Sequence, residues 1–560
     1  MNIVKGFLTS SKPNYQLNVT NLIKHGTRNF GRQEIVSRNH DGTLFRYTYR
    51  DSYVRMQKLA NALESIGAKV GDRVGVLAWN TYQHFEIYFG LPGTGAVMVS
   101  LNLRLAPKEL IYVVNHSEMR FIIVDEDLIQ TAECIAPSCK TVEGYVIITD
   151  KKLTDLETKL EPVFSYEDLV NRASSTYEWP NLDENSAYAA CYTTGTTGKP
   201  KGVYYSHRDI YLQAMMFAAQ FPLQLKDVVF QMVPMFHVLG WSIPQAAAYV
   251  GAKLAFSGRW TLNDIDALVA TIIQEKVTVS AGVPAVFMAI LEAIRKMAKN
   301  IDLTGTRFIC GGSEPPVSLM KSFLDLTGGE IIHSYGSTEA LANVSFNKLK
   351  PWLEKEFSDE NSWKIKKKQG LIVPGLDVKI VDSTGKELPH DGKASGEILL
   401  RGPWIARDYF NFPGTENEFT DDGYFKSGDA GIIDSEEYLK ITDRLKDLIK
   451  SGGEWISSID MENFLVSHPA VLEAAVVGIT HPRWEERPLA LVVVRDEYDK
   501  KVDKEEIREY LGKNFARWQL PDEVLFVTAV PRTSVGKIDK KAIREHYEGI
   551  YAIIEDRKEN

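Results

Sequence analysis

The segment YTTGTTGKPKG at residues 192–202 has the residue types of a phosphate-binding loop. Its threonines offer hydroxyls, its glycines leave backbone N–H groups unhindered, and its lysines add positive charge. It is not a Walker loop, because only two residues separate Gly195 from Gly198 and a proline follows Lys199. We predict a different loop that wraps a polyphosphate, with a flexible surface turn as the alternative. The expected contacts are Thr193, Thr194, Gly195, Thr196, Thr197, Gly198, Lys199 and Lys201.

Other segments downstream combine glycine with charged or hydroxyl residues. They are GGSEPP (311–316), YGSTEA (335–340), YFKSGDAG (424–431), DRLKDLIKSGGEWIS (443–457) and PRTSVGKIDK (531–540). One such motif is weak evidence, but the whole set in this order is specific. The set resembles the adenylate-forming superfamily, which includes acyl-CoA synthetases, peptide-synthetase adenylation domains and luciferases. The resemblance covers nearly the whole chain and is strongest to bacterial and archaeal medium- and long-chain fatty-acid CoA ligases.

The resemblance implies an AMP-forming acid-thiol ligase that uses ATP, Mg²⁺ and coenzyme A. A carboxylate and ATP would give an acyl-adenylate and pyrophosphate, and the thiol of coenzyme A would then give acyl-CoA and AMP. Glu339 is a hard oxygen ligand suited to Mg²⁺, and Thr338 beside it would donate to the α-phosphate. Tyr335 would stack on adenine, with Gly336 next to it. In isolation, Glu339 also fits an ordinary carboxylate at the start of a helix. Its position after a predicted strand disfavours this alternative.

Two more segments complete the nucleotide site that the resemblance implies. GGSEPP is similar to the adenine-pocket segment, although the family often has a small or apolar residue where this chain has Glu314. The residues assigned there are Gly311, Gly312, Ser313 and Glu314. Asp429 matches the ribose-binding aspartate, and Arg444 matches the arginine that supports the sugar and phosphate. Taken alone, an aspartate in Ser-Gly-Asp is just as often a turn former.

Lys537 resembles the mobile catalytic lysine of the C-terminal domain. A carboxylate that approaches a phosphate is repelled by ~1 kcal/mol in water and by ~4 kcal/mol at intermediate dielectric, for unit charges at about 4 Å. A lysine that bridges the two anions removes this barrier. The nearby Lys540 and Lys541 are expected to be solvated.

The family also uses a hinge, which we assign to Lys446 within residues 443–447. In one pose the C-terminal domain would offer Lys537 to the carboxylate. In the other pose, SGGEW would line the tunnel for coenzyme A, with glycines that leave room for pantetheine. The tunnel residues are Gly452, Gly453 and Glu454.

The acyl pocket is assigned to the segments VPMFHVLGW and SAGVPAVF. Taken alone, a histidine between apolar residues is usually a packed core residue. The family carries an aromatic-histidine segment here that borders the acyl and coenzyme A sites, so the resemblance implies that His237 is a wall of the catalytic pocket rather than a proton-transfer group. Trp241 would close the acyl side, and Val283 and Pro284 would line it. These segments show no base for a second carboxylate and no acid for an amino group, which favours an aliphatic fatty monoacid. Trp241 is consistent with a gate for a long chain or with a floor that selects short or hydroxylated acids such as hydroxybutyrate.

Two alternatives from other classes are weighed. A peptide-synthetase-type amino-acid module is disfavoured because no carrier domain follows Asn560 and no anchor for an amino group is evident. A non-catalytic nucleotide-binding relative is disfavoured because Lys537, Glu339 and Asp429 are all present.

The elements that position these residues follow an α/β pattern. From Arg73 onward, apolar strand-like runs alternate with helical segments, which predicts a parallel sheet covered by helices. With 560 residues, the chain exceeds the ~250–300 of a single core. We predict a large N-terminal α/β domain (1–442) with a β-rich subdomain at about 374–442, and a small mobile α+β domain (448–560) after the hinge. The subdomain reads as a small antiparallel sheet or barrel.

Composition limits the partners. The net charge of -9 gives no basic field for nucleic acid or anionic lipid, so the expected partners are the carboxylate, ATP and coenzyme A. No signal-peptide core and no membrane-length apolar run is evident, which predicts a cytoplasmic protein. The sequence leaves a homodimer open. The cysteines, Cys134, Cys139, Cys191 and Cys310, are expected to be buried thiols rather than a zinc site.

Overall fold

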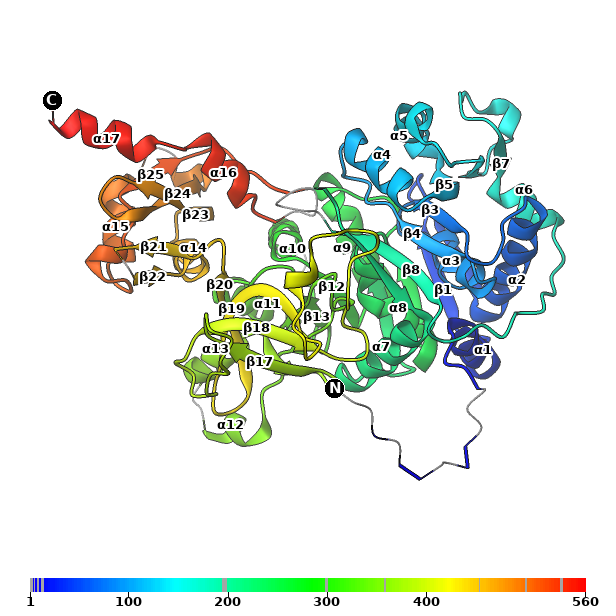
Figure 1. Cartoon of the computed structure of the whole chain (residues 1–560), viewed down its shortest axis with the longest axis horizontal. Helices are drawn as coiled ribbons and strands as arrows, with labels where there is room; N and C mark the ends of the chain where they lie inside the picture. Colours follow the sequence, from blue (N-terminus) through cyan, green and yellow to red (C-terminus); the bar gives the residue numbers. More distant parts are fainter. Residues whose placement is uncertain are drawn as a thin grey trace.

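The computed structural model describes residues 4, 6–7, 10–11, 15–193, 199–297, 301–356, 359–452, 454–498, 501–533 and 537–559. It has a large N-terminal α/β part and a smaller C-terminal domain, the latter coloured orange to red in Figure 1. The predicted fold class is confirmed. The N-terminal part is built on two sheets rather than the single covered sheet that the strand pattern suggested.

The first sheet has seven strands and is mostly parallel. Its strands are, in spatial order, β7 (Val163–Ser165), β6 (Gly144–Ile148), β5 (Met119–Asp125), β3 (Arg73–Leu77), β4 (Val97–Ser100), β8 (Ala187–Tyr192) and β9 (Gly202–Ser206). These strands are almost entirely buried, as expected for parallel strands with both faces covered. Only β9 runs antiparallel, as the partner of β8. The loop predicted to bind phosphate joins these last two strands.

The second sheet has thirteen strands. In spatial order they are β17 (Asp377–Val381), β18 (Gly396–Arg401), β19 (Phe425–Ile433), β20 (Tyr438–Arg444), β16 (Gly370–Ile372), β15 (Ser345–Phe346), β14 (Glu330–Tyr335), β13 (Arg307–Cys310), β12 (Val279–Gly282), β10 (Val228–Gln231), β11 (Lys253–Phe256), β1 (Glu34–Arg38) and β2 (Leu44–Thr48). Strands β10 to β14 are parallel, whereas β14 to β20 are antiparallel. The β-rich segment therefore continues the large sheet through β15 and β16 instead of forming a sheet of its own.

A helical layer separates the two sheets. Helix α3 (Tyr82–Gly93) contacts β4 of one sheet and β1 of the other, and each of its residues is buried. The other helices of this layer are α1 (Val19–Phe30), α7 (His207–Gln220) and α8 (Ile243–Val250). The remaining helices of the N-terminal part are α2 (Tyr49–Ser65), α4 (Pro107–His116), α5 (Ile129–Ile135), α6 (Tyr166–Arg172), α9 (Ile265–Glu275), α10 (Pro284–Lys296), α11 (Val317–Thr327), α12 (Pro351–Glu356) and α13 (Asp359–Lys366). One continuous apolar core spans the layer and both sheets.

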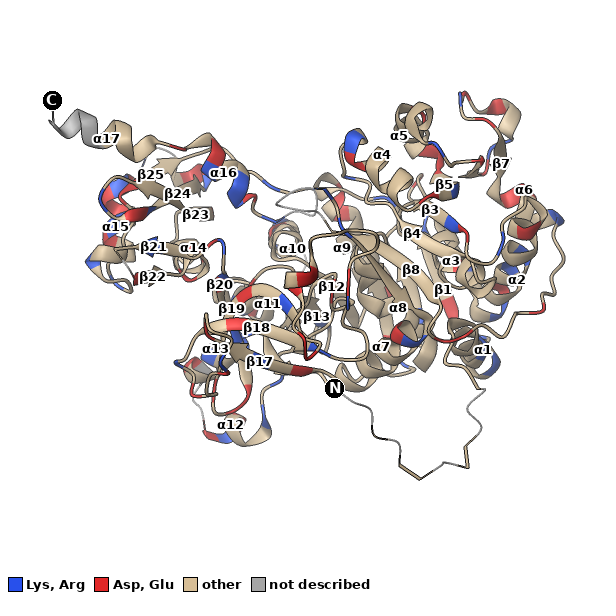
Figure 2. Ribbon diagram, in the orientation of Figure 1, with Lys and Arg blue, Asp and Glu red and all other residues tan. Residues whose placement is uncertain are grey.

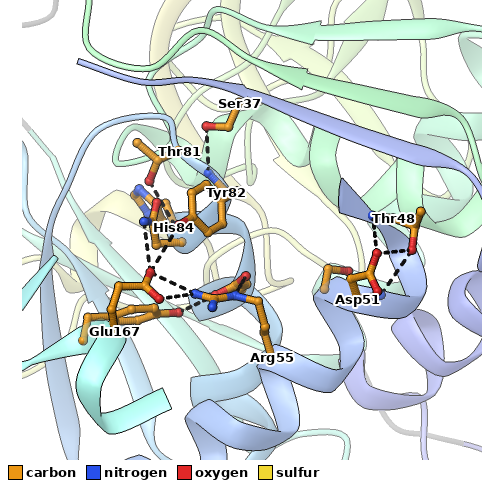
Figure 3. Close-up of polar contacts among 12 residues, drawn as sticks. Ser37, Thr48, Asp51, Arg55, Thr81, Tyr82, His84 and Glu167 are labelled. Atoms are coloured by element: carbon orange, nitrogen blue, oxygen red, sulfur yellow. Dashed lines mark hydrogen bonds and ion pairs between the residues drawn. The ribbon is translucent and has the colours of Figure 1, made fainter. Parts of the chain in front are cut away.

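A buried ionic cluster ties three helices together beside this core (Figure 3). Arg55 of α2 donates to the buried carboxylate of Glu86 on α3 at 2.6 Å and to Glu167 on α6 at 2.9 Å. Tyr166 donates to the other oxygen of Glu86 at 2.8 Å, and Tyr82 donates to Glu167 at 3.2 Å. One guanidinium thus pairs with two carboxylates, so loss of Arg55 would leave both without their counter-charge.

The C-terminal domain has its own sheet and its own apolar core. The strands are β22 (Glu454–Ile456), β21 (Ile449–Ser451), β24 (Glu485–Val494) and β23 (Val471–His481), with β25 (Glu523–Phe526) parallel to β24. The helices are α14 (Ser458–Val466), α15 (Lys504–Leu511), α16 (Lys540–His546) and α17 (Ile550–Glu559). Helix α14 packs against β20, so it joins the two parts of the molecule.

The surface and the thiols test two further expectations. Figure 2 shows acidic and basic residues interspersed, as on α15, with no broad basic face in this view. Among the described residues, no helix is long and apolar enough to cross a membrane. Cys191 and Cys310 are buried as expected, but Cys134 is exposed, because it lies on the outer side of the short helix α5.

Candidate active site

The phosphate-loop prediction falls largely outside the described residues, which omit Thr194, Gly195, Thr196, Thr197 and Gly198. Its two ends are described and lie together. The amide of Thr193 donates to the carbonyl of Lys201 at 2.9 Å, and the amide of Lys201 donates to the Thr193 hydroxyl at 3.2 Å. The ammonium of Lys199 lies over the ring of Tyr112. The loop is therefore closed at its base at the carboxyl end of β8, where open α/β sheets bind ligands.

Lys201 and Glu339 are linked by residues that the sequence did not single out. The Lys201 ammonium forms an ion pair with Glu418 and lies 4.6 Å from the ring centre of Tyr409. The Tyr409 hydroxyl donates to Glu339 Oε1 at 2.7 Å. Tyr409 therefore connects the lysine predicted to bind phosphate with the carboxylate predicted to bind metal. No local signal marks Tyr409 or Glu418, because their partners are far away in the chain.

The loop after β14 is held rigidly at Thr338 and Glu339. Tyr205 donates to the Thr338 carbonyl at 2.6 Å, and the Ala406 amide donates to the Glu339 carbonyl at 2.7 Å. Gly336 is required by space, since a Cβ there would lie 1.0 Å from the carbonyl oxygen of Ala342. The Glu339 side chain is partly exposed, and its carboxylate is oriented by a hydrogen bond from Tyr409.

Glu339 fits Mg²⁺ of the kind that is held mainly by a nucleotide. Mg²⁺ typically takes one or two protein carboxylates and completes its shell with phosphates and water. In the described parts of the chain, no group of three or more His, Cys, Asp and Glu side chains forms a metal cage. A single oriented carboxylate at Glu339 matches the first pattern.

Asp429, Tyr335 and Arg444 form a compact polar group. Strands β19 and β20 pair Asp429 with Arg444, and the Arg444 Nε lies 3.1 Å from Asp429 Oδ1. The Tyr335 hydroxyl donates to Asp429 Oδ2 at 2.6 Å. Both carboxylate oxygens are thus oriented by partners, and the aspartate is 5% exposed. The residues predicted to hold ribose and adenine are brought together, and Asp429 lies within a strand rather than in a turn.

Three predicted groups converge on Gly311 and Gly312, which directly follow β13. A Cβ on Gly311 would lie 3.1 Å from the Trp241 ring. A Cβ on Gly312 would lie 3.2 Å from the Val283 side chain and 3.8 Å from Cε of Lys537, and Gly312 has a φ of +82°. Pro284 begins α10 immediately beyond Val283. The two glycines leave the space that the acyl-side residues and the C-terminal lysine occupy.

Lys537 lies at the N-terminal site. Burial and the positive charge of Arg444 lower the pKa of Lys537 to about 8, while the charges of Asp429 and Glu339 act in the opposite direction. Its own loop is closed by the Thr533 amide, which donates to the Lys537 carbonyl at 2.8 Å. The C-terminal domain is thus docked with its lysine next to the groups predicted to bind the nucleotide.

The expectation that both neighbouring lysines are solvated is wrong for Lys540. Its ammonium lies 2.9 Å from Glu462 and donates to the Ser458 hydroxyl at 2.5 Å, with the side chain 10% exposed. Lys540 begins α16, which packs on the domain's sheet, so its side chain points inward. Lys541 is exposed as predicted.

His237 lies in a low-polarity environment beside the docked lysine. Burial, followed by the positive charges of Lys537 and Arg104, lowers the pKa of His237 to about 4. The imidazole is therefore neutral near pH 7. It lines a small cavity together with Cys191, Phe236 and Thr338. This environment agrees with a pocket wall better than with a proton-transfer group.

The segment after His237 has an unusual backbone. Residues 238–242 all have positive φ, between 35° at Val238 and 61° at Trp241, and only one of them is a glycine. Such conformations cost roughly 1 kcal/mol or more per non-glycine residue and often occur at functional sites. The turn places the Trp241 ring against Gly311, with the indole side chain 9% exposed.

The hairpin predicted to line the tunnel for coenzyme A lies elsewhere. Gly452 has a φ of +60° and its amide donates to the Trp484 carbonyl at 3.0 Å, while Gly453 lies outside the described residues. Glu454 begins the exposed strand β22. Lys446 is at the surface between β20 and β21, and burial of part of its side chain lowers its pKa. In this pose Gly452 and Glu454 form their hydrogen bonds and strand pairing with other residues of the C-terminal domain.

Glu314 is directed away from the nucleotide groups. Its carboxylate accepts from Asn463 of α14 at 2.8 Å and from Gln369 at 3.3 Å. Burial, with a smaller contribution from Asp460, raises the pKa of Glu314 to about 7. The predicted adenine-pocket residue therefore contacts the C-terminal domain, while Ser313 beside it is exposed.

Comparison with known proteins agrees with this arrangement. Residues 24–410 match the AMP-binding enzyme family, and residues 460–537 match the AMP-binding enzyme C-terminal domain. The chain is 43% identical over 542 residues to a long-chain-fatty-acid–CoA ligase of Thermus thermophilus, covering 96% of each chain. It is 37% identical over 536 residues to a medium-chain-fatty-acid–CoA ligase of Ectopseudomonas oleovorans, covering 95% of this chain and 96% of that one.

The fold agrees as well. The crystal structure of the anthranilate CoA ligase AuaEII in complex with anthranoyl-AMP has a TM-score of 0.82 at 24% identity, covering 96% of this chain and 98% of that one. The chain belongs to the AMP-binding enzyme family. Within that family it is an AMP-forming acyl-CoA synthetase, an acid-thiol ligase whose substrates are a carboxylate, ATP and coenzyme A.

Proposed function

We propose that this synthetase activates a medium- or long-chain aliphatic monoacid. The observation that carries the proposal is the apolar wall beside Lys537, where Trp241 and Val283 pack against Gly311 and Gly312. The relatives in Thermus thermophilus and Ectopseudomonas oleovorans are named for long- and medium-chain fatty acids, which supports the same substrate class. ATP and coenzyme A are metabolites of the cell interior, which supports the cytoplasmic location predicted from the sequence.

The first half-reaction joins the carboxylate to the α-phosphorus and breaks its bond to pyrophosphate. In our assignment, Lys537 lies between the two anions, and the loop at 193–201 together with Lys201 binds the outer phosphates. Asp429, oriented by Tyr335 and Arg444, accepts from the ribose hydroxyls. Mg²⁺ held by Glu339 would neutralise phosphate charge when bound. Catalysis then rests on positioning and charge neutralisation, with no covalent bond to the protein.

The second half-reaction transfers the acyl group from AMP to the thiol of coenzyme A. We assign it to a second pose in which the C-terminal domain turns about Lys446 and brings Gly452, Gly453 and Glu454 to the site. The hinge at 443–447 separates an N-terminal domain at 1–442 from the mobile domain at 448–560 in this proposal. Its support is that Gly452 and Glu454 contact residues of the C-terminal domain in the docked pose, whereas Lys537 lies at Gly312 of the N-terminal part.

A panel of carboxylates tests the substrate. Saturated acids from butyrate to palmitate, together with 4-hydroxybutyrate, benzoate and leucine, are compared by pyrophosphate release and by thioester formation. We expect the highest kcat/KM for the medium or long saturated acids. If 4-hydroxybutyrate or butyrate is preferred, Trp241 acts as a floor and the short-chain or hydroxy-acid alternative holds. An amino acid as the best substrate would favour the peptide-synthetase class instead.

A further inference from the structure

Glu314 lies at one end of a loop that the C-terminal domain contacts at two points. At Gly312, Cε of Lys537 is 3.8 Å from the position of a Cβ. Two residues further on, the Glu314 carboxylate accepts a hydrogen bond from the side chain of Asn463 at 2.8 Å. Both contacts join parts of the chain that are more than a hundred residues apart. The position of Lys537 and the contact at Glu314 are therefore features of the same docked pose.

The N-terminal side of this contact is fixed by Gln369. The Ile441 amide of β20 donates to Gln369 Oε1 at 2.7 Å. Because an amide N–H can only donate, the oxygen of Gln369 must face β20 and its Nε2 must face Glu314, to which it donates at 3.3 Å. Gln369 is 3% exposed, so its orientation is enforced by packing as well. The Glu314 carboxylate is thus held in place and presents its other oxygen to Asn463.

The C-terminal side of the contact is the face of α14 that turns toward β20. Asp460 and Asn463 are three residues apart in this helix, so they lie on one face. Asp460 forms an ion pair with Lys440 of β20, in which both carboxylate oxygens are 3.0 Å from the ammonium. Gln369 links Glu314 to Ile441, the residue next to Lys440 in β20, so both contacts lie beside the same strand. Together they hold Asp460 and Asn463, and with them one face of α14, against β20 and the 311–316 loop.

We propose that Glu314 is a positioning residue for the adenylation step. Its carboxylate accepts the hydrogen bond from Asn463 of α14, and this contact, here called the latch, holds Lys537 at Gly312. This inference rests on the proposed role of Lys537. The contact requires a side chain at position 314 that can accept a hydrogen bond, which a small or apolar residue does not provide. Its carboxylate points to the domain contact and leaves the nucleotide to other residues. Loss of the latch should therefore slow adenylation and leave ATP binding unchanged.

Single-turnover kinetics of the two half-reactions test the latch. The wild-type enzyme must first form acyl-adenylate, which tests the proposed function separately. Removal of one partner from a buried hydrogen bond typically changes an equilibrium by about 10-fold. We expect Glu314→Ala and Asn463→Ala each to slow adenylation by at least about 10-fold, with KM for ATP changed by no more than about 2-fold. Thioester formation from supplied acyl-adenylate and coenzyme A should stay within about 2-fold of wild type, because it does not use the docked pose.

Substitutions that change charge separate a latch from a general loss of structure. Asn463→Asp places a second carboxyl group against Glu314 and should slow adenylation at least as much as Asn463→Ala. In the Glu314→Ala background, Asn463→Asp should slow adenylation no further, because the Glu314 carboxylate that would repel the new aspartate is absent. Asn514→Ala, at an exposed asparagine of the same domain, is the matched control and should behave as wild type.

Three results would overturn the proposal while leaving the enzymatic function intact. The first is a rise in KM for ATP in Glu314→Ala with a normal Asn463→Ala, which would make Glu314 a nucleotide contact. The second is an equal loss in both half-reactions, which would indicate general damage. The third is full additivity of Glu314→Ala and Asn463→Asp, which would show that the two side chains act independently.

Discussion

Replacement of Lys537 by alanine should separate the two half-reactions. The lysine contacts the N-terminal site in the docked pose, with Cε 3.8 Å from the position of a Cβ on Gly312 and with Asp429 and Glu339 near enough to affect its pKa. Two unit charges about 4 Å apart interact by ~4 kcal/mol at an effective dielectric of about 20. Complete loss of that interaction corresponds to roughly 10³-fold in rate. Water that enters the vacated space will recover part of it, so we expect a loss of at least ~10²-fold in adenylation.

The assay follows pyrophosphate release in a single turnover and, separately, conversion of supplied acyl-adenylate and coenzyme A to thioester. The second reaction should stay near the wild-type rate, because Lys537 leaves the site in the second pose that we propose. Lys541→Ala is the control, since its side chain is 53% exposed and only four residues away. Equal losses in both half-reactions for Lys537→Ala would refute the assignment of this lysine to one pose. A Lys537→Ala enzyme that adenylates at the full rate would refute its catalytic role.

Four further outcomes are expected. Since the pKa of Lys537 is lowered to about 8 and the charged form is the active one, kcat/KM for adenylation should fall as pH rises above about 8, and Lys537→Arg should move this limb to higher pH in a pH–rate profile. Glu339→Gln should lower the adenylation rate strongly while the Kd for ATP, from equilibrium titration, changes less; a full-rate variant would disprove the metal assignment. Trp241→Gly should extend the usable acyl chain, by several-fold per added methylene at ~0.8 kcal/mol each, and an unchanged substrate profile would place Trp241 outside the pocket. Arg55→Met should destabilise the N-terminal part by roughly 3–5 kcal/mol through the uncompensated Glu86, whereas Arg55→Met with Glu86→Leu should lose less in thermal unfolding.

Much of the local structure follows from the sequence because strands and helices have distinct periodicities. The alternation predicted from Arg73 onward is present, since β3, α3, β4, α4 and β5 follow one another there. The order of strands across the sheets was not accessible in this way. Strand β1 near the N-terminus pairs with β11, more than two hundred residues later, and no periodicity reports such a partner. The division into two sheets depends on those long-range pairings.

In the candidate site, too, local motifs could be read from the sequence, whereas contacts between distant segments could not. The resemblance of short motifs to the adenylate-forming superfamily predicted roles for Glu339, Asp429 and Lys537, each of which lies in a recognisable local pattern. Tyr409 and Glu418 were missed because their contacts with Glu339 and Lys201 cross the fold. Their local sequence is that of an ordinary turn-rich segment.

Backbone strain was equally hidden from the sequence. The segment VLGWS adopts positive φ throughout, although four of its five residues are not glycine. Nothing in the local sequence favours that conformation, since β-branched and bulky residues avoid it. Packing of the Trp241 ring against Gly311 accompanies it in the folded protein. Such positions become visible only when the surrounding structure is known.

In the proposed mechanism, the order of the half-reactions follows from charge balance at Lys537. Without ligands, the docked ammonium faces the cation Arg444 and the carboxylates Asp429 and Glu339, and burial disfavours its charge. With ATP in place, the substrate carboxylate adds further negative charge beside the ammonium, and it is this ternary complex that stabilises the docked pose. Departure of pyrophosphate removes most of that charge, and a buried cation without enough counter-charge costs several kcal/mol. Undocking then becomes favourable at the stage when coenzyme A must enter. A lysine fixed in the N-terminal domain would offer no such release, which is a physical reason for carrying it on the smaller domain.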